Sequence, residues 1–237
     1  WRAFSSDPKM VWPWYLYRRT RCRAAAPNDG HLAIARLEDT LGDRFKLATQ
    51  NVDGLHIRAG STLGRCYEVH GNIDYMRCSK ECALEAGSER AFDPLVDRLA
   101  FLQPVPDHLG PVSKNGDFDD TWREHLTCSH CGAWMRPHVL WFDETYDEEK
   151  YRFESSLRAM MSADLLITVG SSGATNLPMM MAEIAVRSNI PIIDINLEAN
   201  PFSKFAAIYK GEIRGSASQG LTPIVELLVA NCDTPWS

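Results

Sequence analysis

The 237-residue sequence contains no apolar run close to the ~20 residues that cross a bilayer, so we expect no membrane-spanning helix. It also lacks an excess of positive charge, since 25 Lys and Arg residues face 31 Asp and Glu residues and the formal net charge is -6. Because nucleic acids bind to basic surfaces, this balance argues against a direct nucleic-acid ligand. It suits a basic peptide partner, although many acidic proteins have no such partner.

Neither the GxGxxG dinucleotide fingerprint nor the GxxxxGK[ST] phosphate loop occurs in the sequence. Internal repeats and low-complexity segments are absent as well. The first residues, Trp1 to Phe4, contain no Met and do not resemble a signal peptide. We therefore expect the chain to begin inside a longer one.

The sequence does contain seven cysteines, an odd number that is too sparse for a secreted disulfide scaffold. Four of them form two close pairs, Cys78-x3-Cys82 and Cys128-x2-Cys131. A short loop lets both sulfur atoms of a pair point at one ion, and four thiolates suit tetrahedral zinc. Because no coordination position stays open for water, we predict a structural zinc. Paired thiols also indicate a reducing compartment, hence an intracellular, cytoplasmic protein.

Hydrophobic periodicity predicts an α/β protein. The expected elements are helices within residues 8–41 broken by a turn at 27–30, strands at 45–49 and 139–142, a buried strand at 164–169, a small-residue turn at 170–173, a helix at 177–187 and a strand at 191–196. The strand at 45–49 ends at polar residues, as buried parallel strands do. The last four elements form a βαβ unit, which predicts a doubly wound parallel sheet.

Three polar motifs are candidates for chemistry. Gln50, Asn51 and Asp53 follow the first strand; amides can bind a carboxamide and a carboxylate can bind sugar hydroxyls, but a turn that caps a helix has the same pattern. His70 could accept a proton at neutral pH, or could be an ordinary structural histidine. The turn at residues 170–173 precedes a helix, where backbone N–H groups can bind phosphate, although this short pattern is common.

Together these motifs resemble the sirtuin family. The segments that carry the resemblance are residues 49–60, Val69-His70-Gly71, the four paired cysteines, residues 136–144, 169–172 and 195–198, in the family's order. The resemblance extends from about Phe4 to Leu228. It implies a Rossmann-like domain beside a smaller zinc-bearing domain, with NAD and an acylated lysine meeting in a cleft.

The resemblance also implies residue roles and boundaries. By analogy, His70 is the general base, aided by Asn51 and Asp53, and Gln50 joins these two at the nicotinamide and ribose. Gly170, Ser171 and Ser172 resemble the ribose and phosphate contacts, Asn196 and Glu198 the adenosine ribose contacts, and Ala217 the adenine-edge position. We expect residues 1–72 and 136–237 to form the Rossmann-like NAD-binding domain, and residues 73–135 to form the inserted zinc-binding module.

The implied activity is NAD-dependent removal of acyl groups from lysine side chains, giving nicotinamide and O-acyl-ADP-ribose. Val139 to Glu144 resemble the strand on which the peptide substrate pairs, with Leu140 and Phe142 on one face lining the acyl-lysine tunnel. A merely buried apolar strand has the same pattern. The alternatives to deacylation are ADP-ribosyl transfer, NAD hydrolysis and non-catalytic NAD binding.

Tyr15 and Arg18, three residues apart on one helical face, resemble the Tyr-x-x-Arg pair of a sirtuin branch that acts on succinyl and malonyl lysine. A guanidinium pairs with a carboxylate and a phenol adds a donor. An exposed arginine on an amphipathic helix is the alternative. The oligomeric state is not predicted.

Two departures from the family stand out. Its first strand and Gly-Ala-Gly phosphate loop are missing, so the cofactor-binding front end is incomplete. Either the protein has lost this segment, or the segment lies outside the given sequence; the sequence is compatible with both. Asp143 replaces the family's usual glycine, and its negative charge beside the substrate segment favours basic peptides.

Overall fold

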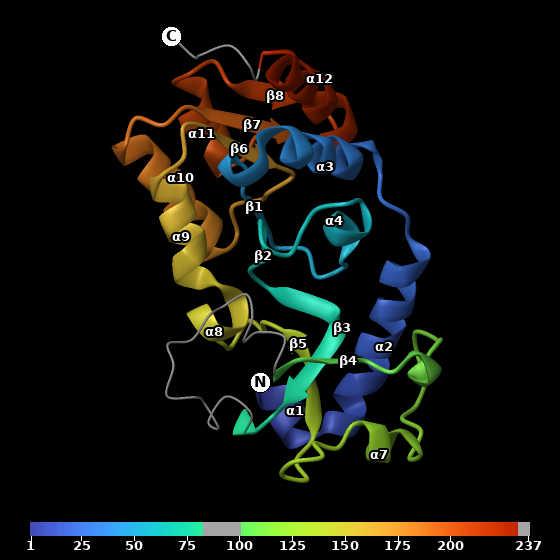
Figure 1. Cartoon of the computed structure of the whole chain (residues 1–237). Helices are drawn as coiled ribbons and strands as arrows, with labels where there is room; N and C mark the ends of the chain where they lie inside the picture. The colour runs from blue at the N-terminus through green and yellow to red at the C-terminus, as the bar shows by residue number, and fades with distance from the viewer. Residues whose placement is uncertain (83–100, 232–237) are drawn as a thin grey trace. The chain divides into compact units, whose positions relative to one another are not determined.

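The computed structural model of the chain describes residues 1–82 and 101–231 and divides into two compact units (Figure 1). Unit 1 comprises residues 1–26, 48–55 and 67–152, and unit 2 comprises residues 27–47, 56–66 and 153–237. The chain passes from one unit to the other at β1 (Leu47–Thr49) and β2 (Cys66–Glu68), which pair in a two-stranded sheet. Cys232 and part of the predicted module, residues 83–100, lie outside the described residues.

Unit 1 is built on an antiparallel sheet of order β4-β3-β5. Its strands are β3 (Gly71–Cys78), β4 (Gln103–Pro104) and β5 (Met135–Val139), and its helices are α1 (Arg2–Ser6), α2 (Pro8–Ala24), η2 (Asp107–Leu109), α7 (Trp122–His125) and α8 (Glu148–Tyr151). The unit thus combines part of the predicted module, residues 73–135, with segments that precede and follow it. The assignment of functional domains stays a prediction.

Helix α2 packs on the sheet of unit 1 through its apolar side. Asp7 caps the helix, because its side chain accepts hydrogen bonds from the backbone N–H groups of Lys9 and Met10. Trp12 and Leu16 are buried in the core of unit 1. The indole of Trp12 also donates to the Met135 carbonyl of β5 at 2.9 Å. A buried indole needs such a partner, so this contact fixes α2 against β5.

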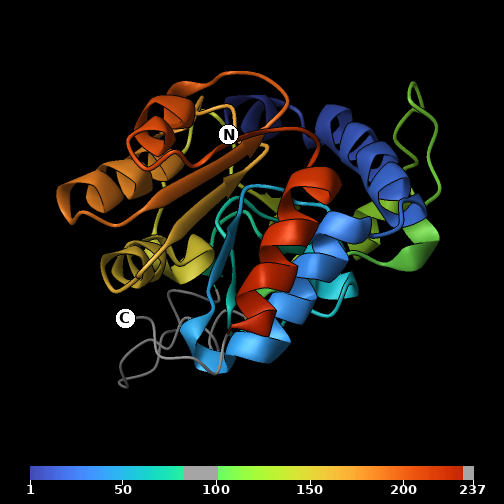
Figure 2. The same cartoon turned by 90° about the horizontal axis from the view of Figure 1, so that it is seen from above.

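Unit 2 contains a parallel sheet of order β6-β7-β8, formed by β6 (Leu166–Val169), β7 (Ile192–Asn196) and β8 (Glu212–Arg214). Its helices are α3 (Asp29–Leu41), η1 (Gly42–Arg44), α4 (Leu55–Arg58), α9 (Phe153–Met161), α10 (Asn176–Arg187), α11 (Pro201–Ala207) and α12 (Ala217–Ala230). The first residue of α4, Leu55, still belongs to unit 1. Helices α3 and α12 lie side by side (Figure 2). They pack on β7 through Leu37, Leu221 and Ile195.

The structure confirms the predicted βαβ unit, since α10 connects β6 to its parallel neighbour β7. It also confirms two helices separated by a turn before residue 42, and Gly42 ends α3 with a φ of 56°. Within residues 1–82 and 101–231, no helix is long and apolar enough to cross a membrane.

Three strand predictions need correction. The strand predicted at 139–142 is wrong, because β5 ends at Val139 and the next residues form a turn in which the Glu144 N–H donates to the Trp141 carbonyl at 3.0 Å. Strand β6 begins at Leu166 and is half-buried, since it lies at the edge of its three-stranded sheet. Strand β1 begins at Leu47, and its Ala48 is exposed because the strand belongs to a sheet of only two strands.

Candidate functional site

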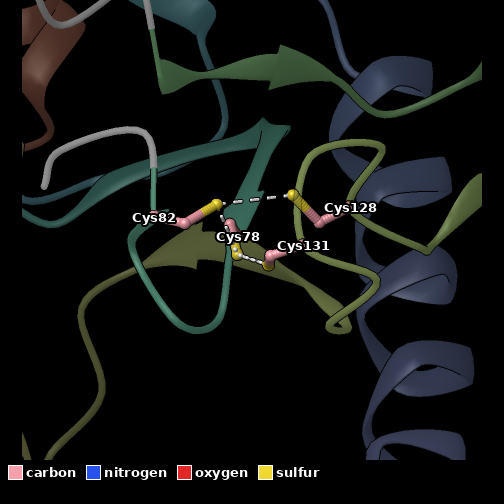
Figure 3. A group of neighbouring side chains, drawn as sticks. All are labelled: Cys78, Cys82, Cys128 and Cys131. Carbon is pink, nitrogen blue, oxygen red and sulfur yellow. Dashed lines mark hydrogen bonds between the residues drawn. The ribbon is translucent and has the colours of Figure 1, made fainter. Parts of the chain in front are cut away.

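The four paired cysteines of unit 1 converge on one point. Cys78 ends β3 and Cys82 follows it, whereas Cys128 and Cys131 lie in the turn before β5. That turn is closed by the Cys128 N–H, which donates to the Ala133 carbonyl at 2.7 Å. Figure 3 shows the four side chains pointing toward one another, and all four Sγ atoms lie within 4.8 Å of each other.

The distances between these sulfur atoms fit a tetrahedral metal ion. The Sγ atoms of Cys78 and Cys131 are 3.4 Å apart, and those of Cys82 and Cys128 are 3.7 Å apart. Both distances are far longer than a disulfide bond. A Zn–S bond of about 2.3 Å gives sulfur–sulfur edges of about 3.8 Å. The cysteine cluster therefore fits the structural zinc predicted from the spacing.

His70 lies between β2 and β3, and both of its ring nitrogens have partners in unit 1. Nδ1 lies 3.0 Å from the Gln50 carbonyl oxygen, and Nε2 lies 2.7 Å from the Tyr146 hydroxyl. A carbonyl can only accept, so Nδ1 carries the hydrogen and donates it. Burial lowers the pKa of His70, and this effect is only partly opposed by the Gln50 carbonyl. The ring is therefore neutral at pH 7, with Nε2 as its proton-accepting atom.

The polar loop after β1 lies against the strand that follows His70. The backbone N–H of Ile73 donates to the Val52 carbonyl at 2.8 Å. Asp53 accepts a hydrogen bond from the Leu55 N–H at 2.9 Å, which caps α4, and Asn51 is exposed. The structure thus brings the Gln50 carbonyl into contact with His70 and keeps Asn51 and Asp53 on the same loop. The bond from Leu55 also fits the helix-capping alternative for Asp53.

Gly71 holds His70 close to the end of β5. Its φ is 85°, and a Cβ atom there would lie 2.1 Å from the His138 carbonyl oxygen. Only glycine permits this approach. The backbone N–H of Leu140 then donates to the His70 carbonyl at 2.9 Å. As a result, the proposed base and the proposed substrate segment are fixed to each other.

The segment after β5 is held by an ion pair. Arg136 lies 3.7 Å over the Trp141 ring and binds both carboxylate oxygens of Glu144. Burial raises the pKa of Glu144, but the hydrogen bonds and charge of Arg136 outweigh it and keep the pKa below its usual value. Leu140 is half-buried, whereas Phe142 is fully exposed. Because this segment is a turn, the period-two argument that placed these two residues on one face does not apply.

Tyr15 and Arg18 share one side of α2. Tyr15 is buried, and its hydroxyl oxygen accepts a hydrogen bond from the Trp141 indole at 2.6 Å. Burial raises its pKa, while the Trp141 hydrogen bond and the Arg18 charge lower it. The guanidinium of Arg18 lies 4.7 Å over the Trp14 ring and makes no hydrogen bond or ion pair with any residue that the structure describes. Its neighbour Arg19 is instead paired with Asp74 at 2.9 Å.

The remaining predicted residues belong to unit 2, at the carboxyl ends of its parallel strands. Gly170, Ser171 and Ser172 follow β6, Asn196 ends β7 and Glu198 follows it, and Ala217 begins α12 after β8. The Asn196 amide donates to the Ser171 carbonyl at 2.8 Å, and the Gly215 N–H donates to the Asn196 carbonyl at 3.1 Å. Ligands of parallel α/β sheets bind at this edge, so these residues stay candidates for a ligand site.

Comparison with known proteins identifies the family of this chain. The family model described as the Sir2 family matches residues 2–176, which is more than half of the chain. The chain belongs to the Sir2 family. It is 34% identical over 230 residues to an NAD-dependent protein deacylase of Leptospira interrogans, covering 97% of this chain and 79% of that one. It is also 32% identical over 227 residues to the NAD-dependent protein deacylase sirtuin-5, mitochondrial, of Danio rerio, covering 94% and 70%.

Solved Sir2 structures have the same fold. A Sir2 homologue in complex with NAD has a TM-score of 0.69 and 28% identity, with 98% of this chain and 75% of that chain covered. A mutant Sir2 homologue in complex with ADP ribose has a TM-score of 0.72 and 26% identity, with 100% and 80% covered. The predicted sirtuin resemblance and the Rossmann-like α/β fold with its cysteine cluster are confirmed.

Three side chains that shape the site were not predicted from the sequence motifs. Tyr146 contacts His70, Trp141 contacts Tyr15, and Asp194 is fully buried beneath the loops of unit 2. Asp194 accepts hydrogen bonds from Thr168 and Asn200, each at 2.8 Å. An acidic residue in the middle of the apolar run at 191–196 was the available signal, because a buried carboxylate needs several donors.

Proposed function

We propose that this Sir2 protein is an NAD-dependent protein-lysine deacylase with His70 as its general base. The observation that carries the proposal is the arrangement of the half-buried His70 ring, whose Nδ1 donates to the Gln50 carbonyl and whose pKa is lowered by burial. Such a ring has one atom, Nε2, that can accept a proton at pH 7. Relatives named NAD-dependent protein deacylase support the same activity.

The other predicted residues complete this assignment. NAD, when bound, supplies the ribose and the nicotinamide leaving group of the reaction. Gln50, Asn51 and Asp53 would bind the nicotinamide and ribose, with His70 taking a proton from a ribose hydroxyl. The residues at the carboxyl edge of the unit 2 sheet would hold the adenosine and phosphates. The acyl-lysine peptide would bind along Val139 to Glu144, where Leu140 and Phe142 would contact the acyl-lysine side chain.

The activity is tested by incubating the protein with NAD and a panel of acyl-lysine peptides, and following nicotinamide and O-acyl-ADP-ribose. We expect His70→Ala to lower the rate at least ~100-fold, because general-base catalysis contributes that much. His108→Ala, which removes an exposed imidazole of unit 1, is the control and should leave the rate unchanged. Free ADP-ribose or ADP-ribosylated protein as the main product would favour the hydrolase or transferase, and NAD binding without turnover would favour a non-catalytic protein.

We also propose a preference for succinyl or malonyl groups over acetyl. Arg18 has no carboxylate partner among the described residues, and the Tyr15 hydroxyl accepts from Trp141, which leaves its own hydrogen to donate. Trp141 directly follows Leu140, whose N–H binds the His70 carbonyl. This chain of contacts connects the Tyr15 hydroxyl to the base. A guanidinium and a phenol together suit a terminal carboxylate.

The acyl preference is tested with Arg18→Met, and with Arg21→Met on the exposed side of the same helix as the control. A charge-assisted, bidentate contact contributes about 1.5–3 kcal/mol, so Arg18→Met should lower kcat/KM for succinyl peptides by roughly 10- to 100-fold. Deacetylation should be spared. Equal loss for both acyl groups would show that Arg18 has no role in acyl recognition.

We further propose that the cysteine cluster holds one structural zinc and that the protein is intracellular and cytoplasmic. The four thiol groups lie close enough to bind one ion, and thiol ligands persist in reducing compartments. Although burial raises the pKa of Cys128, the backbone N–H groups of Cys131 and His130 and the neighbouring thiols lower it to about 7. Cys128 therefore loses its proton more readily than Cys78 and Cys82, whose pKa values are raised by burial.

A further inference from the structure

The proton-accepting nitrogen of His70 is already occupied in this structure. The Tyr146 hydroxyl lies 2.7 Å from Nε2, and the two rings are stacked with their centroids 5.7 Å apart. Because Nδ1 donates to Gln50, Nε2 can only accept, and Tyr146 must donate. An imidazole nitrogen has a single lone pair in the ring plane. While Tyr146 binds it, no substrate hydroxyl can donate to the same atom.

Tyr146 lies between two anchored residues, one at the end of the proposed substrate segment and one at the start of α8. Glu144, two residues earlier, is bound by Arg136. Asp147, the next residue, caps α8 by accepting from the Lys150 N–H at 2.7 Å. Tyr146 therefore lies in a short connection between two fixed points. It closely follows the segment Val139 to Glu144, where we propose that the peptide binds. Because the Leu140 N–H keeps this segment fixed to the His70 carbonyl, only the Tyr146 side chain has to move for Nε2 to become free.

We propose that Tyr146 caps the general base in the substrate-free protein and leaves Nε2 when the substrates bind. This inference rests on the proposed deacylase function, and it makes Tyr146 a positioning residue rather than a catalytic one. The cap keeps His70 in the tautomer with hydrogen on Nδ1. It also makes the base available only when the peptide segment is occupied.

The charged and titratable groups around His70 do not provide another explanation for its neutral state. Asp53 lies on the loop that packs beside His70, and Glu68, two residues before it, accepts a hydrogen bond from Asn72 at 2.6 Å. The pKa of His70 is lowered by burial and raised by the Gln50 carbonyl. Tyr146 is thus the titratable group that binds the ring directly.

The test is Tyr146→Phe, which removes the hydroxyl and keeps the stacked ring. A hydrogen bond to the neutral form of a base lowers its pKa, so the variant should raise the pKa of His70 in the substrate-free protein by roughly 0.5–1 pH unit. NMR titration of the His70 ring measures this without any substrate. Tyr146→Leu should shift the pKa in the same direction, and Tyr209→Phe of unit 2 should leave it unchanged.

The pH dependence of the kinetic constants then distinguishes a Tyr146 cap from a structural or proton-relaying role of this residue. The pH profile of kcat/KM reports the free protein and that of kcat reports the substrate complex. A cap that leaves on binding predicts that Tyr146→Phe moves the acid limb of kcat/KM to higher pH and leaves the acid limb of kcat in place.

Three results would overturn the proposal. An unchanged His70 titration would show that Tyr146 does not bind Nε2 in solution. Acid limbs that stay in place in both profiles would indicate a purely structural tyrosine. A loss of kcat above ~100-fold would indicate that Tyr146 relays the proton. If the deacylase assignment itself fails, the NMR titration still tests the cap alone.

Discussion

The candidate residues of the two units are held in different ways. In unit 1 they come from segments far apart in the sequence, and contacts such as Gln50 with His70 and Trp141 with Tyr15 join them. In unit 2 they occupy loops that follow successive parallel strands, and backbone hydrogen bonds such as Gly215 with Asn196 connect those loops. Unit 1 therefore depends on a few long-range anchors, whereas the unit 2 edge follows from its strand order.

Metal removal should produce the largest difference between the units. The apparent binding free energy of a structural zinc is on the order of 10 kcal/mol, so chelation should unfold the cysteine-bearing end of unit 1. Hydrogen exchange should then lose protection in β3 and β5, while β6 and β7 stay protected.

Matched variants make this test specific. Cys128→Ser should reproduce the effect of the chelator, whereas Cys22→Ser, outside the cluster, should not. Each chain should release one zinc ion. Equal loss of protection in both units would break the comparison, because it would mean that one cooperative core spans the chain.

The second prediction concerns the buried anchor of unit 2. Asp194→Ala removes the close acceptor of Thr168, Asn200 and Ser203, and leaves Thr168 and Asn200 only backbone carbonyls at 3.4 Å. We expect unit 2 to lose about 3 kcal/mol in denaturant unfolding, because several buried donors lose their close acceptor together. The control is Glu212→Ala, which breaks an exposed ion pair with Arg214 and should cost less than ~1 kcal/mol. Similar costs for both variants would mean that the unit 2 loops are held by their backbone alone.

The sequence was most informative about features that depend on residues close together in the chain. The strand at 191–196 and the helix at 177–187 were predictable, because apolar periodicity is decided within a few turns of chain. The spacing of Cys78, Cys82, Cys128 and Cys131 was equally sufficient, since two short loops can bring four sulfur atoms to one ion. The strand, the helix and the spacing within each cysteine pair are features that neighbouring residues determine.

The rest depended on tertiary contacts that the sequence does not display. The strand predicted at 139–142 failed because Glu144 binds Arg136 and turns the chain back on itself. Tyr146 was missed because its partner, His70, lies 76 residues away. No pattern within a segment reveals such a pair, and long-range pairs of this kind hold most of the unit 1 site.

The third prediction tests the close approach of β3 and β5. Gly71→Ala places a Cβ 2.1 Å from the His138 carbonyl oxygen at a left-handed φ, so we expect a loss of about 3 kcal/mol and a displaced His70. Gly132→Ala is the control, because Gly132 has a φ of 70° but no atom within 4 Å of its Cβ position. That variant should cost about 1–2 kcal/mol, the left-handed strain alone. Similar stability of the two variants would mean that the strands separate easily.

The smallest predicted effect concerns the pH at which deacylation is lost on the acid side. Only neutral His70 can accept a proton, so deacylation should fall as the pH drops through the pKa of this residue. Burial lowers that pKa below its ordinary value of about 6.5, so the acid limb of kcat/KM should lie below 6.5. Activity measured from pH 5 to 8 locates the limb. A limb above 6.5 would mean that a nearby negative charge stabilises the imidazolium, and Asp53, on the adjacent loop, would be the carboxylate to replace first.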